Sequence, residues 1–274
     1  MKYLISGIAA FLIFTAHDLF LKTEHFHLRP DTEYELLLVN GSFDKSENAV
    51  NSDRIIHPII KGPDYEMIPS VNDWYDADNT AHLKFKTGDP GTYVAGVSTK
   101  PRPIQLSADD FNDYLKHDGV LNILTFRKEH GLMKEDATEL YAKHVKAILQ
   151  VGDEITHHHY SEVLDYPVEF IPVVNPYELS MGGIAEFKLL ANSKTLADQL
   201  VYVGHRPFEE DHDHDEETDH DPMEYPLLTN SEGIVRFMIS EKGYWYLRTI
   251  HMVPVETDSV DYISDWATLT FEID

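Results

Sequence analysis

The 274-residue chain has no cysteine, and its 22 lysine and arginine residues are outnumbered by 48 aspartate and glutamate residues, giving a formal net charge of −26. The missing thiols exclude a disulfide scaffold, thiolate zinc sites, thiol nucleophiles and cysteine-ligated iron–sulfur clusters. The shortage of cations excludes nucleic acids and anionic membrane surfaces as partners, because both would repel the chain. With 42% hydrophobic residues and 16 histidines, the composition indicates an acidic protein with a packed core whose abundant metal-binding group is imidazole.

Residues 1–16 read MKYLISGIAAFLIFTA, with one cation at Lys2 followed by ~13 mostly apolar residues. This layout is typical of a secretory signal, and the apolar run is short for a membrane span. We therefore expect a periplasmic protein, cleaved after Ala16 so that His17 becomes the first residue. An uncleaved short anchor is the alternative, since Phe14 is bulky where the peptidase prefers a small side chain.

Two regions, 17–103 and 165–274, consist of short runs of β-branched and aromatic residues separated by turn formers. Such spacing favours β-sandwiches. In the first region Asp89-Pro-Gly-Thr-Tyr93 resembles the tyrosine corner of immunoglobulin-like folds, in which the phenol bonds back across a turn. We predict a mainly β protein made of two immunoglobulin-like β-sandwich domains over these two ranges.

Residues 104–164 interrupt the β pattern and predict a helical connecting segment. Ser107 can cap a first helix that Gly119 ends, and a second helix follows from Val120 to Gly131. A third helix is expected before Gly152, because apolar residues recur there at helical spacing, namely at Leu140, Val145, Ile148 and Leu149.

The sequence contains no recognisable catalytic motif. The sequence has no Gly-x-Ser-x-Gly elbow, no nucleotide-binding glycine loop and no His-Glu-x-x-His. A glycosidase pair of carboxylates cannot be picked out among so many acids, which are typical of a solvated surface. We therefore do not expect an enzyme.

A histidine- and aspartate-rich loop is predicted at 205–222, between two strands. Its central part, 209–221, holds nine acids, three histidines and no cation. Imidazole suits Ni²⁺, Co²⁺, Zn²⁺ and Cu²⁺, and the acids concentrate cations around it. A loop without apolar residues should bind such ions weakly; a merely solubilising loop is the alternative. The expected ligands are His205, His212, His214 and His220.

Other histidines stand at strand positions. His25 and His27 alternate with Phe26 and Leu28, which indicates solvent-facing imidazoles opposite apolar side chains. His251 ends the aromatic strand 244–250, where a half-buried strand histidine is the plain interpretation.

Several short motifs, in this order along the chain, resemble those of the DUF4198 family. They are Ala16-His-Asp-Leu-Phe-Leu21, Val39-Asn-Gly-Ser-Phe43, Tyr141-Ala-Lys143, Ala147-Ile-Leu-Gln-Val-Gly152, Asn175-Pro-Tyr177, Gly243-Tyr-Trp-Tyr-Leu-Arg-Thr-Ile-His-Met252 and Asp265-Trp-Ala-Thr-Leu-Thr-Phe271. The resemblance implies an exported protein of the kind described as periplasmic components of cobalt or nickel uptake. It also implies functional roles for a histidine after the signal and for a His-Met pair, here His17, His251 and Met252.

These observations lead to a periplasmic nickel- or cobalt-binding protein, with zinc or copper as further ions, that presents the ion to a membrane metal transporter. We expect the tighter site to use His17 and His251. An immunoglobulin-like structural or adhesion module of the cell envelope is the alternative. A copper enzyme built on an N-terminal histidine is a third interpretation, which needs other ligands to converge on His17.

Deleting residues 209–221 should remove several weak Ni²⁺ sites in a calorimetric titration and change the free energy of unfolding by less than about 1 kcal/mol, as for a surface loop. Cooperative loss of folding on deletion would show instead that the segment is structural.

Overall fold

The chain is mainly β. The computed structural model describes residues 17–208 and 223–274, so the expected signal and the acidic loop, with His212, His214 and His220, lie outside the described residues. In the described part, no helix is both long enough and apolar enough to span a membrane. Four short 3₁₀ segments lie at Ser52–Arg54, Val71–Asp73, His159–Ser161 and Pro176–Glu178.

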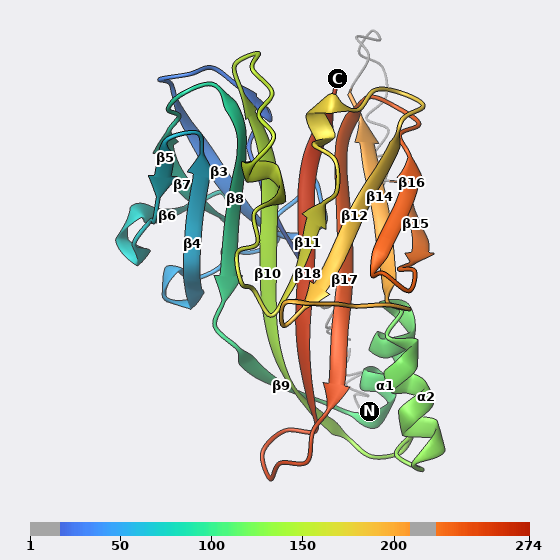
Figure 1. Ribbon diagram of the computed structural model, residues 1–274. Helices are drawn as coiled ribbons and strands as arrows, with labels where there is room; N and C mark the ends of the chain where they lie inside the picture. Colours follow the sequence, from blue (N-terminus) through green and yellow to red (C-terminus); the bar gives the residue numbers. More distant parts are fainter. Residues whose placement is uncertain (1–16, 209–222) are drawn as a thin grey trace, which may run out of the picture.

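Ten strands form one central sheet (Figure 1). Its main path runs β15 (Met223–Leu228), β14 (Leu200–Pro207), β17 (Gly243–Pro254), β18 (Tyr262–Ile273), β10 (Ala137–Val151), β8 (Gly91–Thr99), β4 (Ile55–Gly62) and β5 (Tyr65–Met67). Two further strands, β2 (His27–Leu28) and β9 (Arg102–Leu106), pair with β10. The parallel pairing of β10 with β18 joins strands from the two halves of the sequence.

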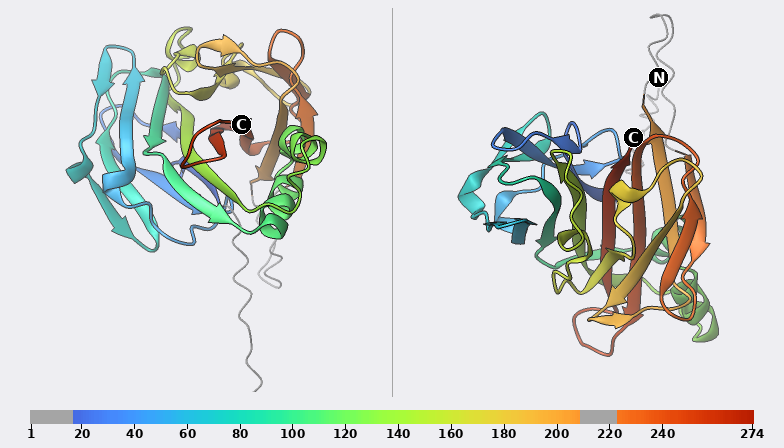
Figure 2. Two further views of the ribbon diagram at one scale, coloured as in Figure 1. Left: turned by 90° about the horizontal axis from the view of Figure 1, so that it is seen from below. Right: turned by 45° about the horizontal axis from the view of Figure 1, so that its top comes forward.

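Two smaller sheets pack against this central sheet. The N-terminal one has the order β1 (Asp18–Lys22), β3 (Glu33–Gly41), β7 (Thr80–Lys86) and β6 (Trp74–Ala77). The C-terminal one consists of β11 (Val168–Pro172), β12 (Ile184–Ala191), β13 (Lys194–Thr195) and β16 (Ile234–Met238). Figure 2 shows the blue N-terminal strands and the yellow-to-orange C-terminal strands on different parts of the central sheet.

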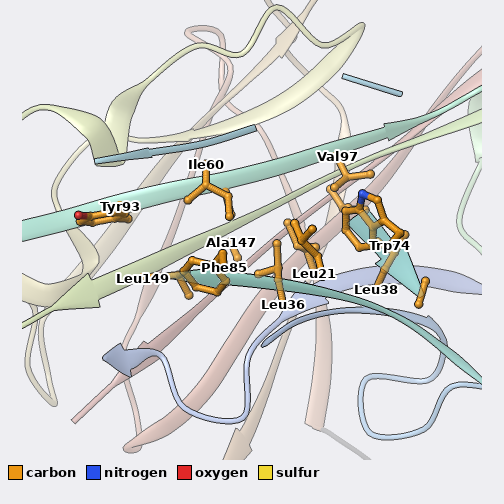
Figure 3. Close-up of a cluster of buried hydrophobic side chains, with 14 of the residues drawn as sticks. Leu21, Leu36, Leu38, Ile60, Trp74, Phe85, Tyr93, Val97, Ala147 and Leu149 are labelled. Carbon is orange, nitrogen blue, oxygen red and sulfur yellow. The ribbon is translucent and has the colours of Figure 1, made fainter. Parts of the chain in front are cut away.

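The two outer sheets cover opposite faces of the central sheet. Tyr93 and Ala95 of β8 belong to the core beneath the N-terminal sheet, whereas Val94 between them belongs to the core beneath the C-terminal sheet. Successive side chains of a strand point to opposite faces, so β8 contributes to both cores. Figure 3 shows the first core, where Leu36 and Leu38 of β3 face Ala147 and Leu149 of β10.

The prediction of two separate sandwiches joined by helices is therefore wrong in two respects. The central sheet is continuous through both β regions, and residues 137–151 form strand β10, not a third helix. In β10, Val145 and Leu149 face one core while Ile148 faces the other. Burial on both faces leaves no regular alternation of apolar and polar residues along β10, so its apolar positions also fit the spacing of a helix.

The other two helices are confirmed. They are α1 (Ala108–His117), whose Ser107 cap accepts a hydrogen bond from the Asp110 amide, and α2 (Leu121–Glu129). Phe111 and Ile123 pack with Ile250 and Trp266, so the helices cover one end of β17 and β18, at the lower right of Figure 1.

The tyrosine-corner prediction is also confirmed as local geometry. The Tyr93 hydroxyl donates to the Asp89 carbonyl at 2.8 Å and accepts from the Gly88 amide at 3.2 Å. The phenol thereby fixes the turn that leads into β8.

Because the two cores share one sheet, unfolding should occur in a single cooperative transition. Leu36→Ala, in the N-terminal core at 1% exposure, should lower the free energy of unfolding of the whole molecule by about 2–5 kcal/mol, as measured by chemical denaturation followed by circular dichroism. Leu228→Ala, at 63% exposure on the edge strand β15, is the control and should change it by less than about 1 kcal/mol. Two separate transitions, with only one shifted by Leu36→Ala, would contradict the shared sheet.

Candidate metal centre

Three metal-ligating side chains converge at one end of the central sheet. Nδ1 of His27 lies 3.2 Å from Oε1 of Glu272 and 2.8 Å from Oδ2 of Asp274. The three ligand atoms all lie within 4.8 Å of one another, and this is the one such group in residues 17–208 and 223–274. Atoms bonded to a single ion at about 2 Å have mutual distances of this order.

Strand pairing brings these distant residues together. At residues 148–151 one edge of β10 is occupied by β8, and β18 pairs with β10 only as far as Ala147. Since a strand has two edges, β2, which pairs with Gln150 and Val151, takes the edge that β18 has left. The end of β18 therefore meets His27.

Neighbouring groups hold Glu272 and His27 in place. The backbone amide of Phe26 donates to Oε2 of Glu272 at 3.1 Å, which leaves Oε1 for the imidazole. The Tyr177 ring lies edge-on to the His27 ring at 4.9 Å, and its hydroxyl donates to the Ile148 carbonyl. The carboxylate is nearly buried, whereas the imidazole is partly open to solvent, so an ion could enter a site whose inner ligand is already oriented.

The electrostatics of the group favour a cation. The pKa of His27 is raised, mainly by its hydrogen bond to Glu272 and further by the charges of Asp274, Glu272 and Asp153, against a smaller opposing effect of burial. A metal ion competes with the proton on such an imidazole, because only the neutral ring can be a ligand. Metal binding at His27 should therefore strengthen as the pH rises through this raised pKa.

A second charged cluster lies where β1 meets the central sheet. Arg248 holds Glu224 with two hydrogen bonds of 2.7 and 2.8 Å and lies 3.3 Å from Asp18 and 3.8 Å from Asp118. Burial raises the pKa of Asp18 to about 6, against the opposing charge of Arg248. Burial also lowers the pKa of Lys143, to about 8. One guanidinium thus compensates three partly buried carboxylates, which suits attachment of β1 and not ion capture.

A family model identifies the family to which the chain belongs. The model described as "Domain of unknown function (DUF4198)" matches residues 14–253. The chain belongs to the DUF4198 family. No curated protein matches it.

Solved structures resemble this DUF4198 chain only weakly. The D0-D1 domain of intimin aligns over 93% of this chain and 97% of that chain, with 8% identity and a TM-score of 0.22. A DUF4785 family protein from Legionella pneumophila aligns over 86% and 52%, with 8% identity and a TM-score of 0.26. The Yersinia pseudotuberculosis adhesin InvE aligns over 93% and 59%, with 11% identity and a TM-score of 0.21. Scores this low support no conclusion about function.

The two histidines expected to form the tight site of this DUF4198 chain are not brought together. His17 precedes β1, with Nε2 3.1 Å from Glu47 and its carbonyl accepting from Lys143. Arg248 of β17 reaches Asp18 and therefore lies on the β1 face. The β17–β18 pairing is regular, so His251, three residues further on, points to the opposite face.

The strand geometry therefore does not place the two imidazoles together, and the two-histidine site and the copper-enzyme interpretation both stay predictions. His251 lies directly opposite Asp265; burial lowers its pKa, and the charge of Asp265 opposes that shift. Its partner in the family pattern, Met252, is a core residue beside the helices.

His205 is likewise packed in the core. Its ring stacks on Trp245 at 4.7 Å, and its Nε2 lies 3.7 Å from Glu241. The side chain is 3% exposed, which does not suit capture of an ion from solvent.

The sequence indicates that His27 is exposed, but it does not identify the carboxylates that join it. Phe26 and Leu28 are buried and His27 is exposed, as their alternation indicates. Glu272 is 245 residues away from His27, and no local pattern sets it apart from the other acids.

Arg248→Met should lower the free energy of unfolding by about 3–5 kcal/mol at pH 7.5, because it leaves three carboxylates together without their cation. The loss should shrink at pH 5, where Asp18, with its pKa of about 6, is protonated and no longer needs the partner. Arg236→Met, which breaks a more exposed pair with Glu186, is the control and should cost less than about 1 kcal/mol. Equal effects of the two substitutions in urea denaturation would contradict this view of the cluster.

Proposed function

We propose that this DUF4198 protein binds a divalent transition-metal ion, nickel or cobalt, through His27, Glu272 and Asp274. The observation that carries the proposal is the convergence of the three ligand atoms within 4.8 Å. The remaining coordination positions would be filled by water, which leaves the ion exchangeable. An exchangeable ion suits capture and release better than permanent structural binding.

The donor set supports a transition metal. Imidazole favours nickel, copper and zinc over magnesium and calcium, whereas carboxylates alone would favour the harder ions. One imidazole with two carboxylates therefore selects for the first-row divalent series, in which copper and zinc are competitors on affinity grounds. Nickel or cobalt comes from the family resemblance and not from the geometry.

The charge of the chain and its N-terminal sequence support the setting of the proposal. A net charge of −26 draws cations toward the surface and raises their local concentration. Residues 1–16 have the layout of an export signal, so we place the protein in the periplasm. There, the acidic segment 209–221 would collect ions weakly and the His27 centre would hold one for a membrane metal transporter.

A structural or adhesion module of the cell envelope, immunoglobulin-like in its sheet packing, is the second candidate. One feature favours it: Ile184 and Met238 lie opposite each other on the C-terminal outer sheet and are 51% and 55% exposed. Apolar surface of this kind suits contact with another protein. Such a module need not bind metal, so a metal titration distinguishes the two candidates.

His27→Ala should weaken the tightest Ni²⁺ site of the full chain at least tenfold, about 1.4 kcal/mol, because it removes the only nitrogen ligand of the three. Isothermal titration calorimetry of the wild type and the variant at pH 7.5 measures this directly. His130→Ala, which removes an exposed histidine at the end of α2, is the matched control and should leave the affinity unchanged.

The pH dependence gives a second readout. The affinity of the wild type should increase as the pH rises through the raised pKa of His27, and the increase should be smaller in His27→Ala. Unchanged tight binding in His27→Ala would contradict this centre, and no Ni²⁺, Co²⁺, Zn²⁺ or Cu²⁺ binding by the wild type would favour the structural candidate.

A further inference from the structure

A cavity of about 620 Å³ opens on the face of the central sheet that carries Asp265, away from the His27 centre. Its volume lies in the range of small-molecule sites. Its walls are largely apolar and include Ile56, Ile59, Ile68, Val163 and Leu164. Three polar side chains that line the same cavity, Ser98, His144 and Asp265, form a chain of hydrogen bonds.

The hydrogen-bonded residues Ser98, His144 and Asp265 are arranged as a nucleophile, a base and a positioning residue. The Ser98 hydroxyl lies 2.8 Å from Nδ1 of His144, and Nε2 of His144 lies 3.0 Å from Oδ1 of Asp265. Asp265 accepts a hydrogen bond from Nε2 of His144. This fixes the orientation of the ring, so that Nδ1 can accept a hydrogen bond from the serine hydroxyl. Ser98 and His144 are 2% and 3% exposed, so the hydroxyl is shielded from bulk water.

We propose that Ser98, His144 and Asp265 form an acyl-hydrolase site for small uncharged esters. The assignment rests on the two hydrogen bonds and on the cavity that all three side chains line, and it is independent of the metal proposal. The residues come from three strands, β8, β10 and β18, so no sequence motif signals them.

The reaction balances with water as the second reactant. Oγ of Ser98 bonds to the ester carbonyl carbon while its proton passes to Nδ1 of His144. The carbon–oxygen bond to the alcohol breaks, and the departing oxygen takes that proton. Water then attacks the acyl carbon and gives a proton to His144, and the bond to Ser98 breaks as Oγ regains a proton. An ester and water thus give a carboxylic acid and an alcohol.

The lining points to an uncharged, apolar substrate. The acids Asp165 and Asp265 line the cavity and would repel an anion. The one lysine of the lining, Lys61, is paired with Glu162 at 2.7 Å, so it offers little free positive charge. The apolar walls suit a short acyl or alkyl chain.

Treatment of the full chain with diisopropyl fluorophosphate tests the site, because this small reagent phosphorylates activated serines much faster than ordinary hydroxyl groups. Peptide mass spectrometry should find one modified residue, Ser98. Ser98→Ala should abolish the modification, and His144→Gln should slow it about a hundredfold or more, the usual contribution of a general base. Ser42→Ala, at an exposed turn serine, is the control and should react like the wild type.

The role of Asp265 needs a readout that a purely structural contact would not give. Asp265→Asn should slow the modification of Ser98, and Asp265→Glu should restore part of the rate, with circular dichroism showing that both variants are folded. No modification of Ser98 in the wild type, or an equal rate in His144→Gln or in Asp265→Asn, would overturn the proposal and leave the three residues as a structural hydrogen-bond network. Hydrolysis of p-nitrophenyl acetate that is lost in Ser98→Ala would support turnover.

Discussion

The parallel pairing of β10 with β18 is the contact on which the rest of the molecule depends. It joins a strand that follows the helices to the last strand of the chain and makes the two β regions one sheet. The pairing buries β10 on both faces, because an outer sheet packs on each side. The same pairing positions both candidate sites. His144 of β10 contacts Asp265 of β18, and His27 contacts Glu272 where β2 replaces β18 beside β10.

The buried charges of the molecule differ in whether a partner balances them. The chain is strongly acidic, yet the buried carboxylate of Glu169 has a cation as partner: it binds Lys146 at 2.9 Å and also accepts hydrogen bonds from the Leu164 and Tyr166 amides. Arg248 similarly compensates the acids beside β1. Buried charges of this kind are costly without partners. At His27 the opposite balance holds, since a single imidazole faces two carboxylates, and this excess of negative charge suits a cation.

Much of the local structure could be predicted from the sequence. The Ser107 cap, the helices on either side of Gly119 and the Tyr93 corner all depend on residues close together in the chain, where short-range rules apply. Strand β10 could not be predicted, because burial on two faces removes the alternation that identifies a strand. The pairing of His27 with Glu272, and the separation of His17 from His251, depend on strand register between distant segments. Register follows from the complete packing and leaves no local signal.

The central functional claim is that the pairing of β10 with β18 and β2 creates a metal centre at His27. Anomalous diffraction at the nickel edge, from crystals of the full chain grown with Ni²⁺, tests it most directly. The account predicts that the strongest anomalous peak lies about 2 Å from Nδ1 of His27 and from the carboxylates of Glu272 and Asp274. A strongest peak at His17, at His251 or in residues 209–222, with none beside His27, would contradict it.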